Sequence, residues 1–89
     1  MLRIDPSRQA QKFLRTLPPK QARQVANKIP ALRQDPQPPD AKQLRGHPYW
    51  RADVGEYRII YRVEQDTLVV PLIGKRNDAE IYRRLRRRG

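Results

Sequence analysis

The sequence contains no cysteine, a single histidine and no long hydrophobic run. The absence of cysteine excludes a disulfide framework and thiolate chemistry, and one histidine cannot by itself build a zinc site. The apolar runs are too short to span a bilayer or to act as a signal peptide. We therefore expect a cytoplasmic protein with no membrane partner.

Acidic residues are also scarce. Nine Asp and Glu stand against 20 Lys and Arg, which gives a formal net charge of +11. Such a charge attracts phosphate backbones, anionic membranes or an acidic protein, and nucleic acid leads this list. Ten of the twelve cations after residue 40 are arginines, whose planar fork suits bidentate phosphate contact. A GC-rich genome that uses arginine for solubility is the simpler alternative.

Length and hydrophobic content limit the size of the core. With 89 residues, 37% of them hydrophobic, there is room for one domain with a small and modestly stable core. We therefore assign residues 1–89 to a single domain that ends in a basic C-terminal tail, residues 83–89. The arginines of this tail repel one another, so we expect it to fray unless a partner neutralises it.

The first third of the chain predicts a short strand and a helix. Leu2 to Ile4 is a candidate edge strand, and Asp5-Pro6 has the N-cap and first-turn proline of a helix start. Apolar residues at helical spacing then predict a first helix over about Pro6 to Leu17. This stripe consists of Ala10, Phe13, Leu14 and Leu17.

A second helix is expected directly after Pro18-Pro19, so the two helices should form an αα-hairpin. Pro30 lies inside its pattern and removes a backbone donor, which predicts a kink or an early end near Ile29. The apolar stripe of this helix consists of Ala22, Val25, Ala26, Ile29 and Leu32 or Arg33.

From Trp50 onward the hydrophobic period becomes that of strands. Apolar residues alternate with arginines from Tyr57 to Glu64, which predicts a half-buried antiparallel strand. One face carries Tyr57, Ile59, Tyr61 and Val63, and the other carries Arg58, Ile60, Arg62 and Glu64. Gln65-Asp66 then connects tightly to the run Thr67 to Ile73, completing a hairpin. Pro71 cannot donate to a ladder, so we expect a bulge or an unpaired position there.

Together these patterns predict an α+β fold. An N-terminal strand and the αα-hairpin should pack on a small, mainly antiparallel β-sheet. The pattern from Asn77 to Leu85 is compatible with a short terminal helix or with a fifth strand.

Cations gather around the ends of the predicted strands. The last hydrophobic run delivers Gly74-Lys75-Arg76 and then Tyr82 to one end of the sheet. The segments Lys42 to Gly46 and Gly55 to Arg62 supply further arginines. This arrangement is typical of a protein that holds a polyanion on a sheet.

The order of elements and these motifs resemble the RelE/ParE family of bacterial toxin components. The resemblance covers nearly the whole chain and is strongest from residue 42 onward. It is carried by Lys42-Gln43-Leu44-Arg45-Gly46, Trp50-Arg51, Gly55 to Tyr61, and Gly74-Lys75-Arg76 with Tyr82. RelE-branch toxins have a microbial-RNase-like fold, cut mRNA in the ribosomal A site and are silenced by a cognate antitoxin. ParE-branch toxins poison DNA gyrase with the same fold.

The RelE branch implies metal-free RNA cleavage, with no organic cofactor and with mRNA, the ribosome and an acidic antitoxin as partners. Such cleavage needs a base, cations that stabilise the phosphorane-like transition state, and an acid for the leaving oxygen. By resemblance, Arg51, Arg58 and Arg76 hold the scissile phosphate, Arg76 is also a candidate acid, and Tyr82 stacks on a base. RNA or ribosome contacts are assigned to Lys42, Arg45, Lys75 and Arg83. ParE-type toxins generally lack the arginine–tyrosine set, which therefore favours the RNase branch.

Asp53 departs from the family pattern, because many RelE-type toxins have a second basic residue at this position. A carboxylate beside Arg51 and Arg58 either serves as the general base or only neutralises the two arginines. We count Asp53 among the catalytic candidates and favour the structural role. Histidine is a common general base, but the place of His47 in a turn favours a surface residue without a catalytic role.

Three functions from different classes remain. The first is an endoribonuclease toxin that acts on translated mRNA, and the second is a ParE-like gyrase inhibitor without chemistry of its own. The third is a non-catalytic basic RNA-binding module.

Overall fold

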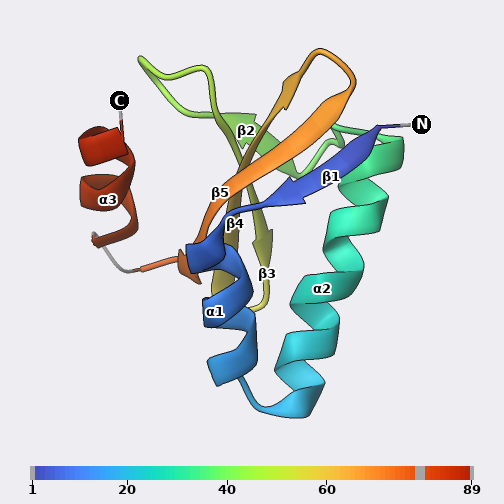
Figure 1. The fold of residues 1–89 in the computed structure, drawn as a ribbon, viewed down its shortest axis with the longest axis vertical. Helices are drawn as coiled ribbons and strands as arrows, with labels where there is room; N and C mark the ends of the chain where they lie inside the picture. The colour runs from blue at the N-terminus through green and yellow to red at the C-terminus, as the bar shows by residue number, and fades with distance from the viewer. Residues whose placement is uncertain (1, 78–79, 89) are drawn as a thin grey trace.

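The protein builds one sheet from short strands and places its helices on both faces, as the computed structural model shows for residues 2–77 and 80–88 (Figure 1). In chain order the elements are β1 Arg3–Pro6, α1 Arg8–Thr16, α2 Pro19–Gln34, β2 Ala41–Gln43, β3 Trp50–Val54, β4 Tyr57–Glu64, β5 Thr67–Lys75 and α3 Glu80–Arg88. Within these described residues the sheet has five strands in the order β1-β5-β4-β3-β2. β1 runs parallel to β5, and the other pairs are antiparallel. The predicted α+β fold with a mainly antiparallel sheet is confirmed.

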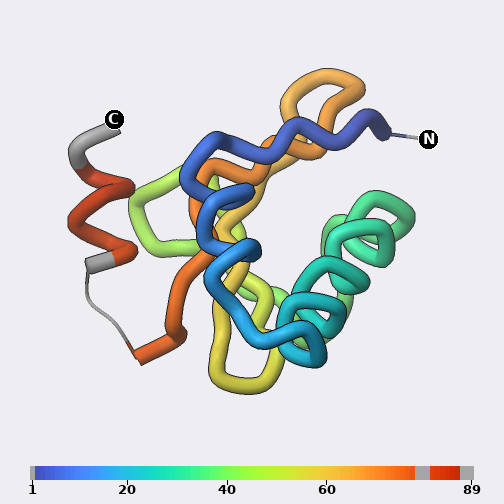
Figure 2. The backbone as a smooth tube through the Cα atoms, turned by 60° about the horizontal axis from the view of Figure 1, so that its bottom comes forward, coloured from blue at the N-terminus to red at the C-terminus, as the bar shows by residue number. Residues whose placement is uncertain are grey.

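The two faces of the sheet carry separate hydrophobic clusters. α1 and α2 cover one face, where Val25 from α2 is buried with Ile59 from β4. α3 covers the opposite face through Ile81 and Leu85, which pack with Ile60. Figures 1 and 2 both place α2 and α3 on opposite sides of the strands. The terminal segment therefore supplies one of the two layers that shield the sheet.

β4 is buried on both faces along its middle. Ile59 and Ile60 are both 0% exposed, although successive strand residues point to opposite faces. The predicted arginine face is therefore partly covered: Arg58 and Arg62 are half-buried on either side of Ile60. Val63, expected on the apolar face, is instead 43% exposed. It lies near the end of β4, where it lines a small hollow with Pro36 and Trp50.

Tyr61 connects the sheet to the proline-rich loop that follows α2. Its buried hydroxyl donates a hydrogen bond to the Pro36 carbonyl at 2.5 Å. Burial, together with the charges of Asp40 and Asp35, raises the pKa of Tyr61 to about 12. Tyr61, predicted on the apolar face of its strand, belongs to the hydrophobic core.

The first helix begins later than the sequence predicted. Ser7, not Asp5, is the N-cap, and its Oγ accepts a hydrogen bond from the Ala10 N–H at 3.1 Å. The same Oγ donates to the Pro71 carbonyl at 2.6 Å. Asp5 and Pro6 extend β1 instead, because pairing with β5 satisfies their backbone and holds them in the extended conformation. β1 does lie at an edge of the sheet, as predicted.

The second helix does not end near Ile29. α2 continues through Pro30 to Gln34, so the expected early end is wrong. Pro30 is exposed, whereas Ile29 and Leu32 are buried on the side that faces the sheet. Packing of these flanking residues outweighs the one hydrogen bond that proline removes.

Pro71 lies at an irregularity of the β4–β5 ladder, as predicted. Ile60 pairs with Leu72 and Arg62 with Val69, so two β5 residues, Val70 and Pro71, lie opposite Tyr61 alone. A bulge of this kind accommodates a residue without an N–H.

The C-terminal segment forms a helix rather than a fifth strand or a frayed tail. α3 spans Glu80–Arg88 and buries Leu85 to 3% exposure. The arginines from Arg83 to Arg88 therefore belong to a docked helix, because one face of this segment is apolar enough to pack on the sheet. Gly89, the last residue of the predicted tail, lies outside the described residues.

We predict that the two hydrophobic clusters differ in their effect on stability. Ile59→Ala should lower the free energy of unfolding by about 2–5 kcal/mol, because it opens a cavity in the main core. Leu85→Ala should cost less, since α3 can undock locally while the rest of the domain stays folded. Chemical denaturation gives the first comparison, and amide hydrogen exchange should speed up selectively in α3 of Leu85→Ala. Equal losses of global stability would contradict local undocking.

Candidate active site

The sheet brings three of the candidate residues together at one end of β3 and β4. Arg51 and Asp53 lie on β3, and Asp53 is the direct cross-strand partner of Arg58 on β4. Because alternate residues share a face, all three lie on the face that α3 covers. This placement follows from register alone, since directly opposite side chains in a ladder are neighbours.

Asp53 and Arg58 form a bidentate ion pair. Arg58 Nε donates to Asp53 Oδ1 at 2.7 Å and Arg58 Nη2 donates to Asp53 Oδ2 at 3.2 Å. Arg51 Nη1 reaches the same carboxylate, at 3.4 Å from Oδ2. The Arg58 side chain is 13% exposed and that of Asp53 29%. One carboxylate thus orients two arginines in a half-buried setting, where such pairs are stronger than on the surface.

Tyr82 closes this cluster from α3. Arg58 Nη1 donates a hydrogen bond to the Tyr82 hydroxyl, and the Arg58 guanidinium carbon lies 5.8 Å from the centre of the Tyr82 ring. Ile81 of α3 packs closely on Gly74, where a Cβ would lie 3.2 Å from Ile81 Cδ1 and would force that side chain to shift by a few tenths of an ångström. The glycine of the Gly74-Lys75-Arg76 motif therefore has a packing role that positions the tyrosine.

The charges in the cluster stabilise one another. Hydrogen bonding to Arg58, opposed by burial and helped by the charges of Arg58, Arg51 and Arg76, lowers the pKa of Asp53 from its ordinary value of 3.8. The hydrogen bond to Asp53 likewise raises the pKa of Arg58, with further help from Tyr82. Asp53 is therefore ionised at neutral pH and Arg58 is charged.

Arg76 stands at the open side of the cluster. It follows β5 in an exposed turn, and its N–H donates to the Glu56 carbonyl at 3.0 Å. Its charge is close enough to contribute to the lowered pKa of Asp53. Lys75 is also exposed and pairs in register with Tyr57. Arg76 is thus available to an anion that approaches the Asp53–Arg58 pair, whereas the register places the Lys75 side chain on the Tyr57 face of the sheet, toward α1.

The remaining predicted contact residues are more dispersed. Lys42 is exposed on β2 opposite Arg51, which places it beside the cluster. Arg83 is exposed on α3. Arg45 lies in the exposed β2–β3 loop, outside the hydrogen-bonded cluster.

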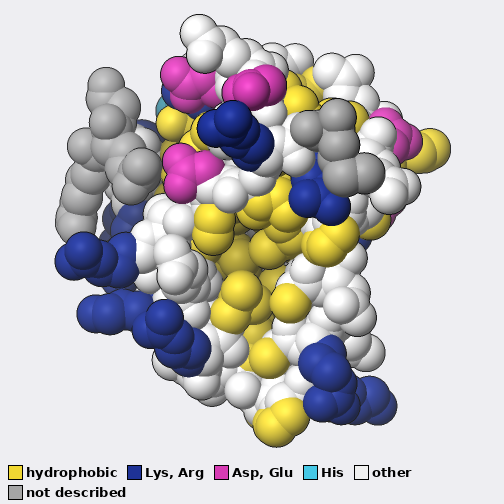
Figure 3. Space-filling view, turned by 45° about the vertical axis from the view of Figure 1, so that its right-hand side comes forward, with side chains coloured by type: hydrophobic (Ala, Val, Ile, Leu, Met, Phe, Trp, Pro, Cys, Tyr) yellow, Lys and Arg dark blue, Asp and Glu magenta, His cyan; other side chains and the backbone are white. Residues whose placement is uncertain are grey.

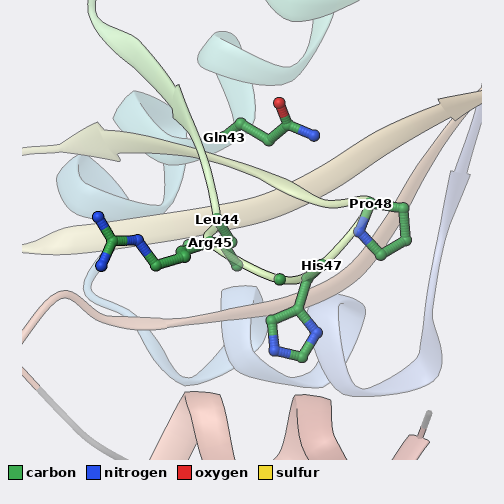
Figure 4. Close-up of a pocket in the computed structure, with 6 residues that line it drawn as sticks. Gln43, Leu44, Arg45, His47 and Pro48 are labelled. Atoms are coloured by element: carbon green, nitrogen blue, oxygen red, sulfur yellow. The ribbon is translucent and has the colours of Figure 1, made fainter.

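The β2–β3 loop lines a shallow hollow of about 550 Å³. Arg45 and His47 point away from one another there (Figure 4). His47 is half-buried, and its backbone N–H donates to Leu44 O at 3.2 Å. Because its polar groups do not converge, this loop does not form a catalytic centre by itself.

Sequence reasoning missed two features on this side of the molecule. Arg62 stacks on Tyr49, with the guanidinium carbon 5.3 Å from the ring centre, and donates to Glu64 at 2.7 Å. A groove between α1 and α3 also carries cations that were not among the predicted site residues. The signal for this groove was present in the sequence, because residues 6–34 contain seven cations and no Asp or Glu.

The donor set does not suit a metal centre. Across residues 2–77 and 80–88, no group of three or more His, Cys, Asp or Glu could hold a metal ion. In the same part of the chain, no helix has the length and apolar character needed to cross a membrane.

The chain matches one known protein family in sequence. The model of the family described as the ParE toxin of the type II toxin-antitoxin system parDE matches residues 4–80. No curated protein matches the chain in sequence.

Several solved structures share the fold. A double arginine-to-alanine mutant of E. coli toxin RelE in the free state has a TM-score of 0.83 at 24% identity, over 98% of this chain and 96% of that one. A chain of the archaeal RelE–RelB complex from Pyrococcus horikoshii OT3 has a TM-score of 0.76 at 27% identity, covering 88% of this chain and 98% of that one. A chain of the RelBE2 toxin-antitoxin complex from Mycobacterium tuberculosis has a TM-score of 0.73 at 25% identity, covering 84% and 98%.

The family match spans most of the chain, and the fold agrees with that of RelE structures. The chain therefore belongs to the RelE/ParE family of type II toxins, matching the ParE toxin family model and having the fold of the RelE toxins.

Proposed function

We propose that this toxin is a ribosome-dependent endoribonuclease that cleaves mRNA in the A site by metal-free acid–base chemistry. The observation that carries the proposal is the cluster of Arg51, Asp53, Arg58 and Tyr82 with Arg76 at its open side. Such a cluster offers a preorganised set of positive charges where a phosphate gains charge in the transition state. Arginines that donate to the phosphate meet one of the three requirements of metal-free cleavage, the stabilisation of the phosphorane-like transition state.

The three arginines differ in how many of their N–H donors are already engaged. Arg58 has five N–H donors, of which three are engaged with Asp53 and Tyr82. It can therefore contribute its remaining donors from a fixed position. Arg51 makes one long contact to Asp53, and Arg76 is exposed. We therefore expect the side chains of Arg51 and Arg76 to move further than that of Arg58 when the phosphate binds. Arg76 is also the candidate acid for the leaving oxygen.

Asp53 is assigned a positioning role. Its carboxylate accepts from Nε and Nη2 of Arg58 and from Nη1 of Arg51, so it orients two of the side chains that hold the phosphate. The lowered pKa makes the carboxylate a weak base, because a good general base has a pKa near the working pH. Tyr82 positions the substrate base with its ring and holds Arg58 with its hydroxyl.

A gyrase-inhibiting function is the second candidate, because the family model that matches is that of the ParE toxins. Induced expression separates the two. Primer extension on cellular transcripts, with and without translation, should show translation-dependent cleavage for the RNase. DNA damage induction with intact transcripts would instead support the gyrase inhibitor. If neither effect is observed, the non-catalytic basic RNA-binding module is favoured.

We also propose an acidic antitoxin as the partner of the α1–α2 face. Figure 3 shows an apolar hollow on this face, with Lys and Arg side chains around it and Asp and Glu side chains near its upper edge. Partly buried apolar residues of this region include Leu2, Ile4, Leu14 and Leu17. An amphipathic acidic segment would cover this surface, and binding to the folded state alone would stabilise the toxin by mass action.

Arg76→Ala should reduce cleavage on the order of 10²-fold, comparable to the removal of one oxyanion donor. The fold should persist, because Arg76 is exposed in a turn. Arg15→Ala is the matched control, since it removes an exposed cation from α1 outside the cluster. Single-turnover cleavage on programmed ribosomes measures both variants, and equal losses would show a general effect of charge.

Tyr82→Ala and Tyr82→Phe should separate stacking from hydrogen bonding. Tyr82→Ala removes the ring that packs on the α3 side of the sheet, so we expect the larger loss of cleavage. Tyr82→Phe keeps the ring and frees Arg58 Nη1, so the loss should be milder. If Tyr82→Phe proves as inactive as Tyr82→Ala, the hydroxyl has a direct part in the reaction.

Asp53→Asn should lower stability at neutral pH. The pKa of Asp53 is lowered on folding. Its charge therefore stabilises the fold at any pH above the ordinary pKa, and this contribution is lost as the pH falls through the lower pKa of the folded state. The loss in free energy of unfolding caused by Asp53→Asn should therefore be largest at pH 7 and should shrink below about pH 4. Urea unfolding across this range measures it. Asp66→Asn is the control, because its partner Arg3 is 4.0 Å away and both are exposed.

The same variant tests the assigned role. A positioning Asp53 predicts that Asp53→Asn retains much of its cleavage activity, because the amide oxygen still accepts from Arg58. Antitoxin binding should be unchanged. A loss on the order of 10²-fold or more would assign Asp53 as the general base.

A further inference from the structure

We infer that the groove between α1 and α3 is a path for single-stranded RNA that leads away from the candidate active site. This α1–α3 groove is lined by Arg8, Gln9, Lys12, Phe13, Thr16 and Arg84, with a volume of about 490 Å³. The inference rests on the proposed RNase function. It assigns a substrate-binding surface to residues that lie outside the catalytic cluster.

The groove is continuous with the candidate site. A smaller hollow of about 130 Å³ shares Gln9, Phe13 and Arg84 with it and extends to Gly74 and Lys75. Gly74 is the cross-strand partner of Arg58, and Lys75 directly precedes Arg76. Ile81 of α3 packs over Gly74, so the connection to the site runs past the end of β5, where a strand whose phosphate lies on the exposed Arg76 would reach the groove at Lys75.

The wall of the groove is fixed at the open edge of β5. β1 pairs with β5 only as far as Val70. Beyond that point the side chain of Gln9 makes hydrogen bonds to the backbone of β5. Gln9 Nε2 donates to Ile73 O at 2.9 Å, and its Oε1 accepts from Ile73 N at 3.0 Å. The N-terminal half of α1 is thereby attached to the strand that carries the site motif, so the position of Arg8 and Lys12 relative to the site is set by the backbone.

The charge of the groove favours nucleic acid. Four cations line the two connected hollows, and their described lining includes no carboxylate; the cations are Arg8, Lys12, Lys75 and Arg84. Phe13, half-buried, presents part of an aromatic ring between them. Cations that follow a strand backbone beside an aromatic platform are the features that bind single strands without sequence preference.

The size of the groove sets the length of the bound segment. Its lining runs along α1 from Arg8 to Thr16, about 12 Å at 1.5 Å per residue. A stacked strand rises about 3.4 Å per nucleotide, so the groove accommodates about three nucleotides. Because the groove leaves the site in one direction, it should bind nucleotides on only one side of the scissile bond.

Oligonucleotide length is the direct test. The isolated full chain is titrated with 2′-O-methyl RNA, which lacks the attacking hydroxyl, as a core of about three nucleotides and as the core with about three more at the 5′ or the 3′ end. One extension should raise affinity on the order of tenfold. The double variant Arg8→Ala/Lys12→Ala should lose this gain, and the salt slope should fall by about 1.4, at about 0.7 per phosphate contact.

The control removes the same charge elsewhere. Lys20→Ala/Arg23→Ala takes two exposed cations from α2 and should keep the gain from the extension. Alanine favours helix in both pairs, and thermal unfolding checks the fold. Equal loss in both double variants, or a gain kept without Arg8 and Lys12, overturns the inference.

The two proposals fail in different ways. If the wild type binds the core but neither extension adds affinity, only the groove inference falls. If the wild type neither binds the core nor cleaves translated mRNA, the proposed function falls as well. Loss of binding to an acidic Glu/Leu peptide in Arg8→Ala/Lys12→Ala, with RNA binding unchanged, would assign the groove to a protein partner.

Discussion

The burial of β4 on both faces is the constraint on which the rest of the molecule depends. Ile59 and Ile60 follow one another and both are fully buried, so a layer is needed on each side of the strand. α1 and α2 supply one layer and α3 the other. Without α3, Ile60 and Leu72 would face water, at a cost of about 1.5–3 kcal/mol for each side chain.

The docking of α3 in turn completes the candidate site. Gly74 leaves room for Ile81, and the next residue, Tyr82, then reaches Arg58. Packing and polar contacts are thus coupled, because whatever shifts α3 also shifts the partner of a catalytic candidate. The site combines a rigid half on β3 and β4 with a half that belongs to a short, separately packed helix.

The Asp53–Arg58 pair explains how a protein of charge +11 assembles arginines side by side. Like charges at this distance repel, and a half-buried carboxylate between them offsets the repulsion. The same carboxylate competes with a phosphate for the Arg58 fork. Phosphate affinity at this site is therefore set by the balance between Asp53 and the more exposed Arg51 and Arg76, which distinguishes it from an all-basic cluster.

The sequence by itself determined the α+β class, the hairpin of β4 and β5, the irregularity at Pro71 and the strand ends where the cations gather, because these depend on local periodicity and on single-residue geometry. The tertiary structure alone decided that Asp5-Pro6 is strand, that α2 continues past Pro30 and that the arginine-rich end is a docked helix. In each case long-range pairing or packing outweighed a local preference. The contacts of Arg58 with Asp53 and Tyr82 likewise join three separate elements, and only the register of the sheet and the docking of α3 bring them together.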